Sequence, residues 1–329
     1  METLLTALRA CAEPTRLRLL ALAARGSFCV MDFTEILGQS QPRLSRHLRL
    51  LHEAGLLVRV REGANVWLAL PAPETTAGSL VRTLLDRLGE DDAVLADDRR
   101  QAARVLSGRA REATETFRRS GADWDEMRAL GLPAATVEAA LLDLLPQDAG
   151  RLLDIGTGTG RLLELLAPRV VSGIGVDASR AMLALARARL SRPQQAQSGM
   201  AHCSVRLGDM YRLPMPDAAF DTVLLQMVLH HADDPAGALA EAARVLRPGG
   251  TLVAIDLAAH ADAEAARRLA HRWPGFTESQ MSAHMIAAGL TPAANAGVAG
   301  RLEVRLWTAT RAAAATPTPD IERLLETAA

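Results

Sequence analysis

Lysine is absent from this chain of 329 residues, so its 37 basic side chains are all arginines. Cysteine is scarce: Cys11, Cys29 and Cys203 stand far apart, which excludes a disulfide framework and fits a reducing compartment. The chain also lacks an excess of positive or of negative side chains, because its formal net charge is only −1. The chain as a whole is therefore not drawn to nucleic acid or anionic lipid, and any DNA binding must come from a local basic patch.

Long apolar runs are also missing. No uncharged segment reaches the roughly 18–20 residues that a membrane-spanning helix needs. The first twenty residues lack the apolar core and cleavage site of a secretory signal, so we expect a cytoplasmic protein with no membrane partner. What the chain does have is length and a hydrophobic content of 49%, which favour two packed domains and a connector.

Short helical patterns followed by a β-hairpin fill residues 1–75. A proline starts the apolar repeat at 14–23, and a glycine closes a second helical run at 29–38. Two β-rich runs within 56–70 enclose a turn at 63–65. The sequence therefore predicts a small α+β domain that ends where two prolines follow the hairpin.

Between these elements, residues 41–54 carry leucines on one helical face and arginines elsewhere. Leu44, Leu48 and Leu51 recur at i, i+4 and i+7 spacing. A helix anchored in this way can present its polar side to a DNA major groove, where arginine pairs with guanine or phosphate and glutamine with adenine. The spacing alone suits an ordinary amphipathic helix with a solvated basic face equally well. The candidate DNA contacts are Gln41, Arg43, Ser45, Arg46 and His47 on the helix and Arg59 and Arg61 on the hairpin.

The order of these elements favours the DNA-binding interpretation. The runs SQPRLSRHLRLLHEAGLL at 40–57 and RVREGANVWLAL at 59–70, with the helix at 14–23, resemble the winged helix-turn-helix of ArsR-type bacterial regulators. That resemblance implies a transcriptional regulator that binds a double-stranded DNA operator as a homodimer. It covers about the first 70–90 residues.

Many ArsR-type regulators sense metals through a Cys-x-Cys pair ahead of the recognition helix. Here Cys29 has Met31 at the second position, and one thiolate with one thioether makes a poor site for a divalent ion. Other relatives use histidines after the hairpin, but none occurs between His52 and His202. We therefore expect no metal site and interpret Cys29 as a small buried residue.

Residues 76–130 are helix-forming throughout and are expected to form a helical connector. Five apolar positions could share one face of it: Val94, Leu95, Val105, Leu106 and Phe117. Because no partner for this face is evident, we expect residues 76–118, together with the helices of the first 20 residues, to hold a homodimer; the alternative for the connector is a solvated spacer.

From residue 151 onward, strand-like runs alternate with helical ones. The strand-like runs are RLLDIG at 151–156, SGIGVD at 172–177, SVRLGD at 204–209, FDTVLLQ at 220–226 and TLVAID at 251–256. This alternation predicts an α/β domain with a largely parallel sheet over 131–312. A low-complexity tail is expected at 313–329.

The stretch LLDIGTGTGR at 152–161 places Asp154 and three glycines between an apolar strand and a helix. Glycines let the backbone turn tightly and approach a ligand closely. Dinucleotide-binding enzymes use a similar loop, but their third glycine would stand where this chain has Arg161. The loop therefore favours another small cofactor.

Three more features follow the glycine loop in order. Asp177 ends the second strand, Asp209 and Met210 end the third, and LQMVLHHADDP stands at 225–235. With the turn in VLRPGGTLVAID, the set resembles the class I S-adenosylmethionine-dependent methyltransferases of the small-molecule branch. The resemblance covers roughly residues 130–310 and implies a Rossmann-like, doubly wound domain behind the N-terminal winged helix-turn-helix.

This resemblance implies S-adenosylmethionine as cofactor, S-adenosylhomocysteine as product, no metal, and a small-molecule methyl acceptor. The residues that would hold the cofactor are Asp154, Gly156, Thr157, Gly158, Gly160, Asp177, Ala178, Asp209, Met210 and Gln226. Asp154 and the glycines would bind the methionine end, Asp177 the ribose, and Asp209 with Met210 the adenine. His230 and His231 are the available proton acceptors near the strand end, or else belong to the scaffold.

Two functions remain open from the sequence. One is a methyltransferase whose expression is controlled by its own DNA-binding domain. The other is a non-catalytic regulator that uses the second domain to sense S-adenosylmethionine or S-adenosylhomocysteine. Both need the same cofactor residues, and the intact loop with both carboxylates tilts the interpretation toward catalysis.

Overall fold

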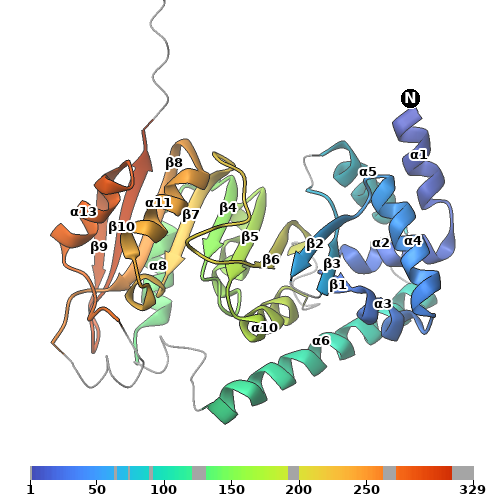
Figure 1. Cartoon of the computed structure of the whole chain (residues 1–329), viewed down its shortest axis with the longest axis horizontal. Helices are drawn as coiled ribbons and strands as arrows, with labels where there is room; N and C mark the ends of the chain where they lie inside the picture. Colours follow the sequence, from blue (N-terminus) through green and yellow to red (C-terminus); the bar gives the residue numbers. More distant parts are fainter. Residues whose placement is uncertain are drawn as a thin grey trace, which may run out of the picture.

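The computed structural model describes residues 2–62, 65–72, 75–88, 92–120, 131–191, 200–261 and 272–312. Figure 1 shows a helical N-terminal part at one end and a large sheet at the other, with the long helix α6 running below from one toward the other. In the described part of the chain, every helix is too short or too polar to cross a membrane. The predicted tail at 313–329 lies outside the described residues.

The N-terminal part contains the predicted helices and hairpin. Its elements are α1 (Glu2–Cys11), α2 (Pro14–Ala23), β1 (Phe28–Cys29), α3 (Val30–Leu37), α4 (Gln41–Glu53), β2 (Val58–Glu62), β3 (Asn65–Ala69), α5 (Thr76–Leu85) and α6 (Ala93–Ser120). Local chemistry sets several boundaries: Glu13 accepts a hydrogen bond from the Arg16 amide to cap α2, and Gly38 ends α3 at a φ of +63°. The three strands form an antiparallel sheet in the order β1-β3-β2.

One apolar core joins all of these helices. Leu44, Leu48 and Leu51 of α4 are buried in it together with residues of α2, α3 and β1. Helices α5 and α6 complete the same core, because Val81, Ala102, Val105 and Leu106 lie in it as well.

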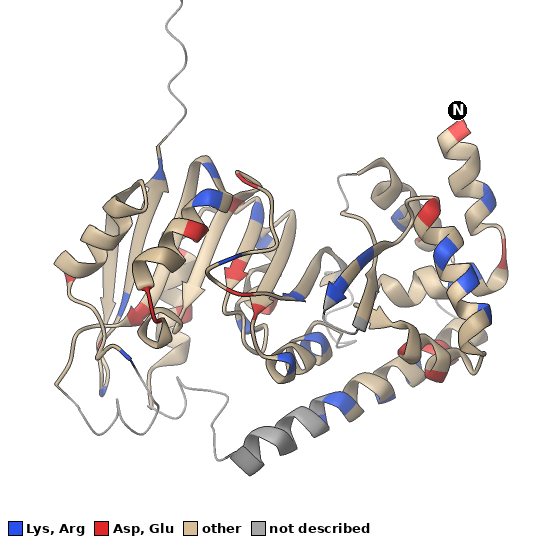
Figure 2. Cartoon of the chain, in the orientation of Figure 1, with Lys and Arg blue, Asp and Glu red and all other residues tan. Residues whose placement is uncertain are grey.

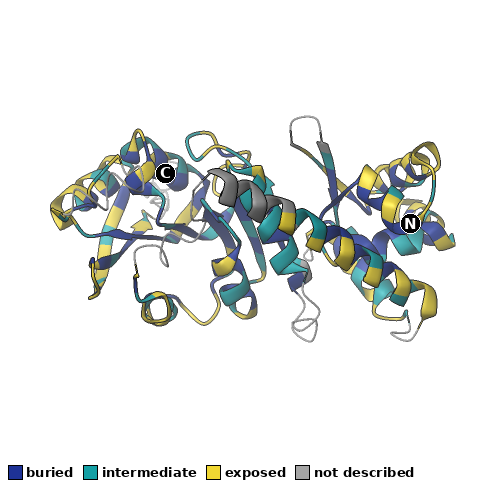
Figure 3. Ribbon diagram, turned by 90° about the horizontal axis from the view of Figure 1, so that it is seen from below, coloured by how far each residue is buried: buried dark blue, intermediate teal, exposed yellow. Residues whose placement is uncertain are grey.

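The apolar face predicted for the connector is therefore covered in part within the chain, since Val105 and Leu106 are buried and Leu95 is half-buried. The premise that this face lacks a partner is wrong for Val105 and Leu106, whereas Val94 is exposed. The side chain of Phe117 lies outside the described residues. In Figure 3, seen from below, α6 crosses from the N-terminal helices toward the sheet with exposed residues along its outer side.

The C-terminal part is the predicted α/β domain. Its elements are α8 (Ala134–Leu144), β4 (Arg151–Ile155), α9 (Arg161–Leu166), β5 (Ser172–Asp177), α10 (Arg180–Leu190), β6 (Cys203–Leu207), β7 (Phe220–Gln226), α11 (Pro235–Val245), β8 (Leu246–Leu257), α13 (Glu278–Ala287), β9 (Leu290–Val298) and β10 (Val304–Arg311). The sheet has the order β6-β5-β4-β7-β8-β10-β9, and its first five strands are parallel. Helices α8, α9 and α10 pack on one face, and α11 and α13 on the other.

This topology confirms the largely parallel, doubly wound sheet and positions the site. The chain runs outward from β4 to β5 and β6, and then returns to β7 on the other side of β4. Ligands of open α/β sheets bind at such a reversal, beside the carboxyl ends of the strands. The two antiparallel strands β9 and β10 were not among the predicted strands.

Candidate functional site

The glycine loop after β4 has a backbone that other residues would strain. Gly156, Gly158 and Gly160 have φ values of +70°, +51° and +74°. A Cβ on Gly156 would overlap the side chain of Val228, and one on Gly160 would lie 3.1 Å from Cβ of Ala186 on α10. The loop is thus held closely between the segment after β7 and helix α10.

Asp154 is fully buried beneath this loop. The Thr157 hydroxyl donates a hydrogen bond to its Oδ2 at 2.6 Å. Burial raises the pKa of Asp154 to about 7; the charge of Asp177 adds to the rise, and the hydrogen bond from Thr157 opposes it. A cationic ligand group near Asp154 would favour the ionised carboxylate.

Asp177 stands at the end of β5, next to the start of α10. The Gly158 amide donates to its Oδ2 at 2.8 Å, and the Ser179 amide donates to its Oδ1 at 2.7 Å. Burial raises the pKa of Asp177, and these two hydrogen bonds oppose the rise. The carboxylate therefore joins the glycine loop to the first turn of α10.

A cavity of about 850 Å³ opens at these strand ends. This volume lies within the range of roughly 300–1,000 Å³ that is typical of small-molecule sites. The predicted cofactor residues that line it are Asp154, Gly156, Thr157, Gly158, Asp177, Ala178, Asp209, Met210 and Gln226. Gly160 is the one predicted cofactor residue outside this lining, since it packs on α10 instead. Oε1 of Gln226 is buried without a hydrogen-bond partner in the described part of the chain, so it can accept a hydrogen bond from a ligand.

The two candidate histidines lie in different surroundings. They belong to the short helical turn η4 (Leu229–His231), with ring centroids 4.2 Å apart. His231 lines the cavity. His230 is fully buried behind it, and its Nδ1 lies 2.6 Å from Oδ1 of Asp256. Of the pair, only His231 can meet a substrate.

Asp256 at the end of β8 holds this turn in place. Its Oδ2 accepts hydrogen bonds from the amides of Leu229 and His230 at 3.0 and 3.3 Å. The sequence interpretation did not select Asp256, although a carboxylate at a strand end is the same signal that drew attention to Asp154 and Asp177.

Several other residues on the cavity wall were missed. They are Glu138, Thr159, Ser179, Met182, Arg189 and Val228. Glu138 lies on α8, ahead of the sheet, and accepts two hydrogen bonds from Arg161 at 2.7 and 2.6 Å. No spacing rule relates α8 to the loop, so only the fold brings these residues together.

The candidate DNA-binding helix α4 has the two predicted faces. Its leucines are buried, while Gln41, Arg43, Ser45 and Arg46 are exposed. Figure 2 shows the basic positions on α4 and a further set on β2 of the hairpin. Arg59 and Arg61 on β2 are exposed as well. From these exposed positions the side chains can meet phosphates or base edges.

His47 departs from this arrangement. Its Nδ1 lies 3.5 Å from Oε2 of Glu13, the residue that caps α2, and its side chain is largely covered. His47 therefore lies toward the neighbouring helix, on a different side from the exposed arginines.

Cys29 is buried, as the sequence interpretation expected. Its sulfur lies 3.5 Å from Nη2 of Arg109 on α6, which also pairs with Asp32. Met31 is exposed. No group of three or more His, Cys, Asp or Glu side chains suited to a metal occurs among the described residues.

The N-terminal part and the C-terminal part each match the model of a known protein family. Residues 13–58 match the family model for bacterial regulatory proteins of the arsR family, and residues 153–254 match that for a methyltransferase domain. The chain joins an arsR-family helix-turn-helix domain to a methyltransferase domain.

Curated relatives match only parts of this chain. An uncharacterized 37.1 kDa protein in a transposon of Streptomyces fradiae is 42% identical over 124 residues, which are 36% of this chain and 34% of that protein. An uncharacterized methyltransferase of Schizosaccharomyces pombe is 40% identical over 30% of this chain and 37% of its own length. A demethylmenaquinone methyltransferase of Deinococcus radiodurans is 37% identical over 39% of this chain and 51% of its own length. The chain thus spans about a third to a half of the length of these relatives.

Among solved structures, a SAM-dependent methyltransferase from Methanosarcina mazei is 18% identical with a TM-score of 0.46. The match covers 53% of this chain and 98% of that one.

Proposed function

We propose that this protein is an ArsR-type transcriptional regulator fused to an S-adenosylmethionine-dependent small-molecule methyltransferase. The observation that carries the second half is the cavity at the ends of β4, β5 and β7, where Asp154 and Asp177 meet the glycine loop. Two carboxylates and the buried Gln226 Oε1 suit a ligand with an ammonium group and sugar hydroxyls.

These residues fit the cofactor part by part. Asp154 and the loop glycines would bind the charged methionine end, and Asp177 would accept hydrogen bonds from the ribose hydroxyls. Asp209 and Met210 would contact the adenine, and Gln226 would lie near the sulfur. The bound cofactor supplies a methyl group on a good leaving group, with S-adenosylhomocysteine as the product.

The chain's own contribution is alignment and proton transfer. The cavity would hold the acceptor in line with the methyl group, which suffices for an acceptor that is already a nucleophile. For a protonated acceptor, His231 on the cavity wall can take the proton. Asp256 and His230 keep the η4 turn, and therefore His231, in position.

The DNA-binding half is proposed to act as a homodimer. A dimer presents two α4 helices to operator half-sites roughly 34–36 Å apart. Helix α1 offers a surface for it, since Leu4, Leu5 and Leu8 are 49%, 41% and 38% exposed. Arg43 and Arg46 would contact the major groove, and Arg59 and Arg61 the flanking phosphates.

A direct test incubates the protein with S-adenosylmethionine labelled in the methyl group and with small-molecule extracts. We expect label in an extracted compound and none with Asp177→Ala. Cofactor binding by calorimetry without transfer to any extract would instead support the non-catalytic sensor, which no observation favours at present. Absence of cofactor binding would refute both.

A further inference from the structure

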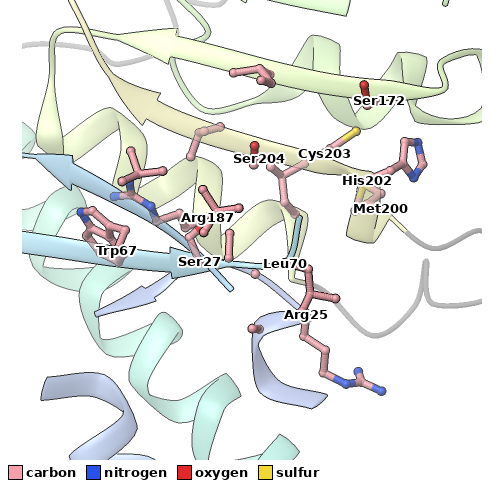
Figure 4. A pocket seen from close by; sticks show the side chains of 18 of the residues that line it. Arg25, Ser27, Trp67, Leu70, Ser172, Arg187, Met200, His202, Cys203 and Ser204 are labelled. Carbon is pink, nitrogen blue, oxygen red and sulfur yellow. The ribbon is translucent and has the colours of Figure 1, made fainter. Parts of the chain in front are cut away.

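The two domains meet at a buried pair formed by an arginine and a tryptophan. The guanidinium carbon of Arg187, on α10 of the methyltransferase domain, lies 3.6 Å from the ring centroid of Trp67 on β3. Arg187 is only 5% exposed and Trp67 only 8%. Stacking of a cation on tryptophan is strongest when both groups are removed from water, as they are here. Figure 4 shows both side chains at one end of the cavity between the domains.

Trp67 belongs to the hairpin that carries the candidate phosphate contacts. We call strands β2 and β3 the wing. Trp67 pairs with Val60 of β2 and with Cys29 of β1, so it occupies the central strand of the small sheet. Arg59 and Arg61 flank Val60 on β2. A displacement of the Trp67 ring therefore acts on the strand that bears both arginines.

The opposite end of α10 belongs to the cofactor cavity. The Ser179 hydroxyl accepts a hydrogen bond from the Met182 amide to cap the helix, and the Ser179 amide donates to Asp177. Gly160 of the loop packs against Ala186, one residue before Arg187. A helix rises 1.5 Å per residue, so about 12 Å of continuous helix separates Ser179 from Arg187.

We propose that α10 couples ligand occupancy of the cofactor cavity to the wing through the contact between Arg187 and Trp67. This proposal rests on the proposed function, because the ligand is S-adenosylmethionine or its product. Ribose hydroxyls that bind Asp177 would share its two oxygens with the Gly158 and Ser179 amides, which changes the set of hydrogen bonds at this carboxylate. The first turn of α10 therefore has different partners with and without ligand, and the helix transmits the change to Trp67.

The interface between the domains contains a cavity that would allow side chains beside Arg187 and Trp67 to move. A cavity of about 130 Å³ lies beside the pair, and Ser27, Leu70, Met200 and Cys203 line it (Figure 4). A fully packed interface would resist small displacements, whereas a void lets side chains shift without overlap. Occupancy then changes operator affinity only to the extent that the ligand prefers one arrangement of α10.

The experiment compares three measurements on the full-length protein. Calorimetry gives the affinity for S-adenosylhomocysteine, hydrogen exchange follows the wing amides, and fluorescence anisotropy gives the affinity for a duplex selected by the protein from a random pool. In the wild type we expect saturating ligand to alter wing exchange and to change DNA affinity by about 5- to 150-fold, the usual scale of such coupling.

Arg187→Ala and Trp67→Leu should reduce the change in DNA affinity to below about twofold, well under that scale. Both variants should still bind S-adenosylhomocysteine, and both should bind the duplex in the absence of ligand. These two controls show that each domain is folded. Trp67→Phe keeps an aromatic face and should preserve coupling, as should Arg104→Ala, which removes an exposed arginine of α6.

The outcomes separate this proposal from the proposed function. Unchanged wing exchange and DNA affinity in ligand-saturated wild type would overturn the coupling and leave the methyltransferase assignment standing. Full coupling in both Arg187→Ala and Trp67→Leu would overturn the route through this pair. If S-adenosylhomocysteine fails to bind the wild type, the proposed function fails and the coupling with it.

Discussion

Asp154, Asp177 and Asp256 all stand near the end of an apolar strand, yet each has a different environment. Asp154 is buried against Thr157, Asp177 accepts hydrogen bonds from one amide of the glycine loop and one at the start of α10, and Asp256 holds a helical turn with His230. The sequence could predict the first two, because glycines or a helix start follow them directly. It could not predict the role of Asp256, since its partners lie 26 and 27 residues earlier in the chain.

The raised pKa of Asp154 makes ligand affinity depend on pH. In the free protein this carboxyl keeps its proton up to about pH 7, and a bound ammonium group favours the ionised form. Binding therefore releases a proton below pH 7, and the affinity for S-adenosylhomocysteine should rise from pH 5 to pH 7. Calorimetry across this range checks the prediction. Asp154→Asn should bind more weakly with a flatter profile; a flat profile in the wild type would contradict it.

The raised pKa of Asp154 also affects the stability of the ligand-free protein, which should decrease as the pH rises, whereas ligand affinity should increase. Because the pKa of Asp154 rises from 3.8 to about 7 on folding, the unfolded chain loses this proton first as the pH increases. The contribution of Asp154 to unfolding free energy therefore falls between about pH 4 and 7 and stays low above it. Asp154→Asn should have a higher melting temperature than the wild type at pH 8 and a smaller difference at pH 4. An equal or lower melting temperature at pH 8 would argue against a buried carboxylate.

Among the elements, those with a local signal were predicted and those stabilised by distant partners were not. Strands β4 to β8 are apolar runs bounded by turns, which the sequence reveals directly. Strand β9 reads LTPAANAGV, which has few β-branched or aromatic residues, and it is a strand because β10 pairs with it. Helix α6 was predicted as a helix, but its packing partners α2, α3 and α10 could not be read from its sequence.

Helix α4 offers a matched pair of substitutions for its packing. Leu48 is 1% exposed and Leu50 is 37% exposed on the same helix. Leu48→Ala should lower the unfolding free energy of the N-terminal domain by about 2–5 kcal/mol, because it removes core contacts and leaves a cavity. Leu50→Ala should change it by no more than about 0.5 kcal/mol. Denaturant unfolding measures both, and equal effects would contradict the observed face of α4.

Substitution of an exposed arginine tests whether the outer face of α4 binds DNA. Arg46→Ala should weaken binding to a selected duplex by about 1–3 kcal/mol if the guanidinium contacts a base edge. Affinity for S-adenosylhomocysteine should not change, since Arg46 lies outside the cofactor cavity. Arg104→Ala on α6 serves as the control for loss of one positive charge. Anisotropy titrations showing equal affinity for Arg46→Ala and wild type would exclude α4 as the reading helix.

For the whole molecule, the sequence could predict two domains from their separate motifs but not how they meet. Arg187 and Trp67 are 120 positions apart, and although Trp67 lies in the run RVREGANVWLAL, nothing in that run indicates a partner in the other domain. Their contact depends on α10 lying along α6, which in turn depends on the core that α6 shares with the N-terminal helices. Because both domains are attached to α6, each constrains the orientation of the other.

Self-association is also a property of the whole molecule. With Val105 and Leu106 of α6 buried in the chain's own core, α1 becomes the main surface expected to mediate a dimer. Replacing Leu5 and Leu8 together with glutamate should convert a dimer to a monomer, because burying two carboxylates against a partner is costly. Sedimentation at micromolar concentration measures this change. The double variant should bind a two-half-site duplex less tightly than the wild type and a single half-site equally well, since linked half-sites add effective concentration. Wild-type protein that stays monomeric both free and on a two-half-site duplex would refute the dimer.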